Sequence, residues 1–236
     1  MFVMHNPVLF IDPTGLWGQY VHETLTIRWL KELGVPEALA TIIGVANYAV
    51  DDLLTIGGFG PLPWQAPGRH FDRRGSYGIN LDTRLFHYNR HFNNAVTIAQ
   101  DAMTVFNHAQ YLASFSGDRQ RFMNDAVAVF NMQMERALIE LGTGWHSLQD
   151  IHAHGVMGRG FLIASHLPNQ LGGRADNINY SWAPASRGWL IGQRQGQLVY
   201  DPERTRLNQT RAATEESFSR FLDAIGGMDN LWRNPF

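Results

Sequence analysis

Cysteine is absent from the 236 residues of this chain, so a disulfide framework is excluded. Any metal site must therefore take its ligands from His, Asp, Glu or backbone groups, and the chain suits reducing and oxidising compartments alike. Net charge is also small: a value of −2 gives no global positive field for nucleic acid, although a local basic groove stays open. No apolar run is long enough to cross a bilayer, and no stretch resembles a signal peptide.

The sequence does contain clear helical periodicity. Apolar residues at Val21, Leu25, Trp29 and Leu33 recur every four positions, which predicts a helix over 20–33. The same kind of pattern predicts further helices over 36–55, 92–115, 118–141, 143–155 and 203–225.

The segments between these helices have little periodicity. Residues 56–91 and 156–202 are rich in loop-forming residues, so we expect two long loops. No strand pattern of comparable strength, no internal repeat and no interdomain linker interrupts the chain. The sequence therefore predicts an all-α fold, a single helical domain whose long loops surround a functional site.

The densest pattern is GWHSLQDIHAHG at 144–155. His146, Asp150 and His154 are spaced i, i+4 and i+8, so successive members drift by only about 40° and all three project from one helix face. Such a face is expensive to bury unless a cation neutralises it, and imidazole and carboxylate are ordinary zinc ligands. A solvated polar face, or histidines satisfied within the core, is the alternative. His152 points elsewhere and would cap the helix or orient the ligands.

Other candidate ligands are scattered along the chain, as a site with several metal ions requires. Asp51 and Asp52 lie in an otherwise apolar predicted helix, where one of them faces the interior and needs a metal ion or an arginine to balance its charge. Each remaining candidate has a simpler alternative, such as a surface position, a loop salt bridge or an Asx turn. These remaining candidates are His22, His70, His166 and Asp176.

The order of these residues resembles a known pattern. WGQYVH at 17–22, an aspartate at 51 or 52, HFD at 70–72 and HSLQDIHAH at 146–154 look like the zinc-dependent phospholipase C superfamily, which includes the fungal-type single-strand nucleases. This resemblance implies the all-helical fold of that superfamily with two or three zinc ions. The metal ligands that it implies are Trp17, His22, Asp51, His70, His146, Asp150, His154, His166 and Asp176.

The N-terminal stretch resembles a second family. NPVLFIDPTGLW at 6–17 looks like the closing signature of Rhs repeat cores, large shells that encapsulate a toxin and are cut after the Leu of D-P-x-G-L. The resemblance implies a cut between Leu16 and Trp17, with a remnant of the shell over 1–16 and a toxin domain over 17–236. It also implies a secreted antibacterial effector of a type VI secretion system, with the parent Rhs shell and a cognate immunity protein as partners. The released toxin is expected to be a monomer.

Together these patterns lead us to expect a toxin that hydrolyses phosphodiester bonds. Metal ions would clamp the phosphate oxygens and activate a water, with Asp51, Asp150 and His146 as the catalytic set. Phospholipid is the expected substrate, because the chain lacks a basic bias and its expected loops carry apolar side chains that could touch lipid. Such an enzyme would act at the membrane or in the periplasm of the target cell. The alternatives are a nuclease acting in the cytoplasm and a non-catalytic, metal-stabilised toxin that binds membranes or proteins.

The expected cut predicts a change in metal content. Cleavage after Leu16 would give Trp17 a free α-amino group, which binds zinc when neutral and has an unperturbed pKa of about 8. A peptide nitrogen has no such lone pair, so the uncut chain should hold fewer ions, or a weaker third ion, than a chain that begins at Trp17. Metal stoichiometry and phosphodiesterase rate of the two preparations test this. Equal values would show that the cut serves release alone.

Overall fold

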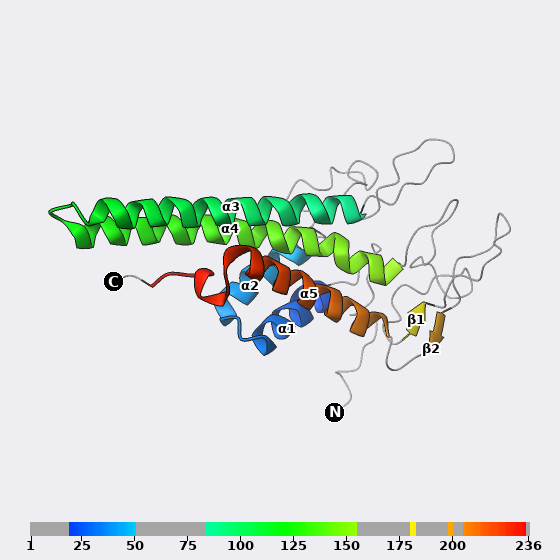
Figure 1. Ribbon diagram of the computed structural model, residues 1–236. Coiled ribbons are helices and arrows are strands. Elements are labelled where there is room, and N and C mark those ends of the chain that lie inside the picture. The colour runs from blue at the N-terminus through cyan, green and yellow to red at the C-terminus, as the bar shows by residue number, and fades with distance from the viewer. Residues whose placement is uncertain (1–18, 51–83, 155–179, 183–197, 201–204, 235–236) are drawn as a thin grey trace, which may run out of the picture.

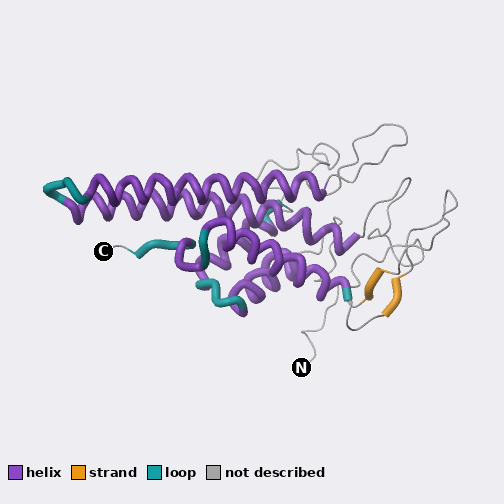
Figure 2. The backbone as a smooth tube through the Cα atoms, viewed as in Figure 1, coloured by secondary structure: helices purple, strands orange, loops and turns teal. Residues whose placement is uncertain are grey.

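The computed structural model describes residues 19–50, 84–154, 180–182, 198–200 and 205–234. Helices dominate these residues, and the strands among them form one short antiparallel pair (Figure 1). The tube in Figure 2 shows how little of the described chain is loop. The elements in chain order are the π-helical turn η2 (Tyr20–Leu25), α1 (Thr26–Glu32), α2 (Glu37–Tyr48), α3 (Arg84–Ala113), α4 (Arg119–His154), β1 (Tyr180–Trp182), β2 (Leu198–Tyr200), α5 (Arg206–Ile225) and the 3-10 turn η4 (Met228–Asn230).

The predicted all-helical class is confirmed for the described residues, apart from two strands of three residues each. None of the described helices combines the length and the apolar character that crossing a bilayer would require.

The long helices α3 and α4 form an antiparallel hairpin (Figure 1). One half of this hairpin packs against α2 and α5, and the other half extends beyond them (Figure 1). Apolar side chains from α2, α3, α4 and α5 share one core, which holds these helices together. A single hydroxyl links three of them, because Trp145 Nε1 of α4 and Tyr88 OH of α3 both donate to Ser217 Oγ of α5 at 2.8 Å.

Two glycines allow α4 to run unbroken beside its neighbours. The prediction of separate helices over 118–141 and 143–155 is wrong, since α4 continues through both. A Cβ on Gly142 would collide with the backbone carbonyl oxygen of Ile43 in α2, and a Cβ on Gly144 would crowd α3. These glycines therefore permit close packing of helices instead of ending one.

The start of α3 also differs from the prediction. The sequence predicted a loop over 56–91, but α3 begins at Arg84. Arg84, Tyr88 and Phe92 are all buried and lie four residues apart, so they form the first part of the buried stripe of α3. The polar composition of this segment hid that stripe, because a buried arginine is unusual.

The other helices follow the prediction more closely. The predicted helix over 20–33 is present, as the π-helical turn η2 followed by α1. The predicted helix over 36–55 is present to Tyr48, and its last five residues lie outside the described ones. The predicted helix over 203–225 is present from Arg206, after an N-cap at Thr205, and it ends at Gly226 with φ of 79°.

The packing of α2 on α4 predicts a strong effect at Gly142. The change Gly142→Ala puts a methyl group against the Ile43 carbonyl, and the backbone of α2 must shift to admit it. We expect a loss of about 1–3 kcal/mol in the free energy of unfolding, measured by urea denaturation. The control is Gly117→Ala, where nothing lies within 4 Å of the new Cβ. Equal stability of the two variants would contradict this packing.

Candidate metal centre

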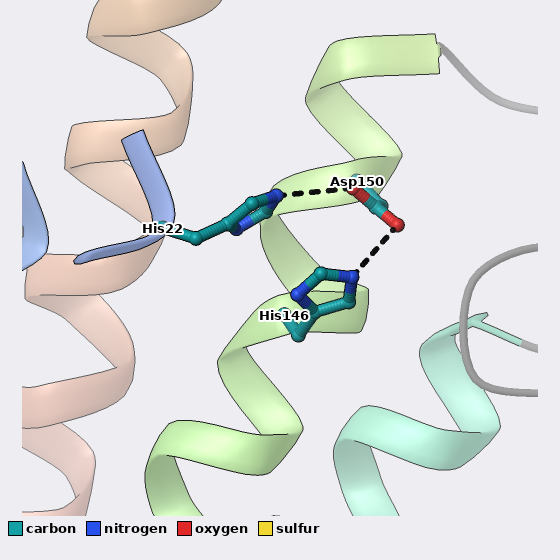
Figure 3. Close-up of side chains that lie close together, drawn as sticks. All are labelled: His22, His146 and Asp150. Atoms are coloured by element: carbon teal, nitrogen blue, oxygen red, sulfur yellow. Dashed lines mark ion pairs between the residues drawn. The ribbon is translucent and has the colours of Figure 1, made fainter. Parts of the chain in front are cut away.

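Three side chains from two distant segments meet inside the helical body (Figure 3). His22 comes from the π-helical turn η2, and His146 and Asp150 come from successive turns of α4. All three side chains are fully buried, with 0% exposure. His22 Nε2 lies 3.6 Å from Asp150 Oδ1, and His146 Nε2 lies 3.5 Å from Asp150 Oδ2. One ligand atom of each residue lies within 4.8 Å of the other two.

The turn that carries His22 is unusual. Residues 20–25 form a π-helical turn, and Thr26 Oγ1 donates to the carbonyl oxygen of Val21 at 3.1 Å. Short π-helical turns inside helices occur frequently at functional sites, because the wider turn displaces a side chain from its ordinary helical position. Here the turn carries the imidazole that faces α4, with its ring stacked on that of His146 at a centroid distance of 4.2 Å.

The proton on His146 is fixed by a backbone group. His146 Nδ1 lies 3.0 Å from the backbone carbonyl oxygen of Asn47, near the end of α2. A carbonyl oxygen can only accept, so Nδ1 carries the hydrogen and donates it. The neutral ring therefore has its lone pair on Nε2, the nitrogen that faces Asp150.

The proton on His22 is fixed through an amide. His22 Nδ1 lies 2.9 Å from Gln149 Oε1, which also accepts from Asn47 Nδ2 at 3.0 Å. The orientation of this amide follows from its other end, where Gln149 Nε2 donates to Thr26 Oγ1 at 3.0 Å and Thr214 Oγ1 at 3.2 Å. Both hydroxyls already donate to backbone carbonyl oxygens, so they accept from the amide nitrogen. The oxygen of Gln149 thus faces His22, whose Nδ1 must donate, so in the neutral ring the lone pair is on Nε2.

The distances are longer than those of direct ion pairs and leave room for a shared metal ion. A charge-assisted hydrogen bond between imidazolium and carboxylate would be about 2.7–2.9 Å long, well below the separations of 3.5 and 3.6 Å observed here. Ligands held about 2.1 Å from a tetrahedral ion lie about 3.4 Å from one another. Each histidine is close to this distance from one of the two Asp150 oxygens, and one ligand atom from each of the three residues lies within 4.8 Å of the other two. Among the described residues, His22 Nε2 also has no hydrogen-bonding partner. Two neutral imidazoles and one carboxylate are a normal donor set for a divalent cation, so the residues fit a zinc ion.

A buried arginine lies next to this group. Arg84 is 1% exposed, and its Nη1 donates to the backbone carbonyl oxygen of Asp150 at 2.6 Å. This contact fixes the first turn of α3 to the turn of α4 that carries Asp150. Burial lowers the pKa of nearby His152 to about 4, and the charge of Arg84 lowers it further, while a hydrogen bond between His152 and Gln209 acts in the opposite direction. His152 is therefore neutral near pH 7.

The structure places only some of the predicted site residues. It brings together His22, His146 and Asp150, and no second group of three such ligands occurs in the described ranges. His154 is the last residue of α4, but its side chain is not among the described ones. The other predicted residues lie outside the described part of the chain, namely Leu16, Trp17, Asp51, Asp52, His70, His166 and Asp176.

Sequence reasoning missed the residues that orient the two histidines. Gln149 lies inside the HSLQDIHAH motif, and its position on the buried side of α4 was the one available signal. Thr26, Asn47 and Thr214 gave no signal, because hydroxyl and amide side chains are common on helix surfaces. Arg84 was hidden by the expected loop over 56–91.

Comparison of the chain with protein-family models, with curated proteins and with solved structures finds no match.

The role of Gln149 can be tested through metal affinity. In Gln149→Met the His22 Nδ1–H loses its acceptor, so the ring is no longer held in the tautomer that directs Nε2 inward. We expect zinc affinity to fall about 10- to 100-fold, because outer partners of ligating histidines have effects of this size. Competition with a chromophoric chelator measures the affinity, and circular dichroism checks that the helices persist. Gln120→Met on the exposed part of α4 is the control, and equal affinities in the two variants would disprove the role.

Proposed function

We propose that this chain is a metal-dependent phosphodiester hydrolase whose centre is built on His22, His146 and Asp150. The observation that carries the proposal is that two imidazoles with fixed Nδ1 protons aim their Nε2 atoms at one buried carboxylate, with one ligand atom from each residue within 4.8 Å of the other two. Three protein ligands are the number that catalytic zinc sites use, and they leave a further position for water or substrate. A zinc ion bound here would polarise a phosphoryl oxygen and lower the pKa of a bound water.

The residues around the ion would each have a separate role. The carbonyl of Asn47 and the amide of Gln149 hold the two rings in the ligating tautomer. Asp150 supplies negative charge to the cation, and Arg84 holds the Asp150 backbone in place. The Arg84 guanidinium also puts a fixed positive charge beside the site, which favours an anionic substrate such as a phosphodiester. The buried surroundings strengthen both of these electrostatic effects.

The finer parts of the proposal rest on the motif resemblances. We propose the fold of the zinc-dependent phospholipase C type and a centre of two or three zinc ions. The further ligands would be Trp17, Asp51, His70, His154, His166 and Asp176, and Asp51 would join His146 and Asp150 in the catalytic set. The biological setting that we propose is an antibacterial effector toxin, cut from an Rhs shell after Leu16 and neutralised by an immunity protein. Its substrate is phospholipid at the membrane of the target cell, with nucleic acid as the competing substrate.

One observation favours a second function. The three ligand side chains have no exposed surface, and structural zinc sites are closed in the same way. A non-catalytic toxin whose metal ion only stabilises the helical body would have such a site. The two functions differ in one measurable respect, since only the hydrolase turns over a phosphodiester.

The test removes one ligand at a time. We expect His146→Ala and Asp150→Asn to lose bound metal and to reduce hydrolysis by more than about a hundredfold, because even outer partners are worth about 10- to 100-fold. The readouts are metal content by mass spectrometry and rates on bis-p-nitrophenyl phosphate, phospholipid vesicles, single-stranded DNA and RNA. The control is His108→Ala, which removes an exposed histidine from α3.

The substrate panel separates the alternatives. Release of the phosphorylated head group from vesicles supports the phospholipase, and cleavage of DNA or RNA supports the nuclease. A chain that holds metal but hydrolyses nothing in the panel would be the non-catalytic toxin. Full metal content and full rate in both ligand variants would show that these residues do not form the centre.

A further inference from the structure

The projecting half of the α3–α4 hairpin carries an apolar groove. Its volume is about 610 Å³, and it lies between the two helices with Val105 on the α3 side and Phe122 and Val129 on the α4 side. These three side chains are between 38% and 57% exposed, although they are large and apolar. Contiguous exposed apolar surface of this kind usually marks an interaction site.

The exposed residues of α4 follow a coiled-coil pattern. Phe122, Val129, Met132 and Ile139 are exposed, and two charged residues fill the places between them. With Asp125 and Arg136 included, the steps along the helix alternate between three and four residues, which is the spacing of a seam between two helices. This seam consists of Phe122, Asp125, Val129, Met132, Arg136 and Ile139, and it spans 18 residues of α4, or about 25 Å. It ends just before Gly142, where α2 covers α4.

The order of residues in the seam identifies its occupant. The stretch has the same character when it is reversed about a centre between residues 130 and 131, with Phe122 exchanging with Ile139, Val129 with Met132, and Asp125 with Arg136. Each apolar residue exchanges with an apolar one, and the acid exchanges with the base. A surface with this property is complementary to itself across a twofold axis.

We propose that the seam binds a second copy of this chain, with the two α4 helices antiparallel. In this arrangement Phe122 packs on Ile139 of the second copy and Val129 on its Met132. Asp125 pairs with Arg136 of the second copy, and symmetry repeats all three contacts. The two hairpins then form a four-helix arrangement, which covers the apolar surface that each leaves exposed alone.

Residues that flank the seam support the antiparallel direction. Arg121 and Glu135 are exposed on the same flank, and the register places Arg121 beside Glu135 of the second copy. Ala128 on that flank lies at the twofold axis, where a small side chain lets the helices approach. A parallel pair would instead place Asp125 beside Asp125 and Arg136 beside Arg136, so like charges oppose it.

This inference is independent of the proposed function, because the seam and the ligands occupy different parts of α4. It differs from the monomer that the sequence led us to expect. The sequence also contains the seam, but only the structure shows that nothing described in the chain covers this face of α4.

The experiment reverses the charges of the seam in the full chain and follows association by sedimentation equilibrium. In Asp125→Arg two positive charges face each other at the contact between positions 125 and 136, and the twofold symmetry repeats this repulsion. We therefore expect the Kd of the dimer to rise at least about tenfold. Arg136→Asp should have the same effect. The double variant with both changes should dimerise like the original chain, and an equimolar mixture of the two single variants should form a heterodimer.

The experiment has one control variant and two outcomes that would contradict the antiparallel dimer. Asp223→Arg makes the same charge change at an exposed position of α5 and should leave the Kd unchanged. A parallel dimer would respond to neither single change, since like charges would face each other before and after. A chain that stays monomeric at every concentration would overturn the proposal and leave the seam to another protein. Circular dichroism of each variant checks that the hairpin remains folded.

Discussion

The side-chain amide of Gln149 is the interaction on which the arrangement of the site depends. Its four hydrogen bonds reach His22 in η2, Thr26 at the start of α1, Asn47 in α2 and Thr214 in α5. Each contact is buried. A buried amide nitrogen or oxygen that has no hydrogen-bonding partner destabilises a protein by about 1–3 kcal/mol. The packing of four elements on α4 and the direction of the His22 ring are therefore parts of one network.

The same network explains why a short motif can predict part of a site but not all of its residues. The i, i+4 spacing of His146 and Asp150 follows from helix geometry, so their shared face was predictable from sequence alone. The meeting with His22, more than a hundred residues away, depends on how α2 and the π-helical turn pack on α4. Periodicity contains no information about that packing, and only the order of motifs in a family resemblance suggested it.

The errors in the predicted fold have a common cause. Gly142 permits contact with α2, and Arg84 is buried by its contact with the Asp150 carbonyl, yet local sequence rules treat glycine as a helix breaker and arginine as a surface residue. In both places a tertiary contact overrides local propensity. The end of α5 was easier to predict, because its Gly226 adopts a left-handed conformation for a local reason.

Complete burial of His22, His146 and Asp150 affects when a metal ion can enter. Side chains with no exposed surface exchange a bound ion only when the elements around them separate, so loading would be coupled to folding and exchange would be slow. Most nitrogen and oxygen sites bind Cu²⁺ more tightly than Zn²⁺ at equilibrium. A site that closes as the chain folds would instead keep the ion that was available at that moment. The identity of the bound metal would then depend on which ion was available in the compartment where the chain last folded.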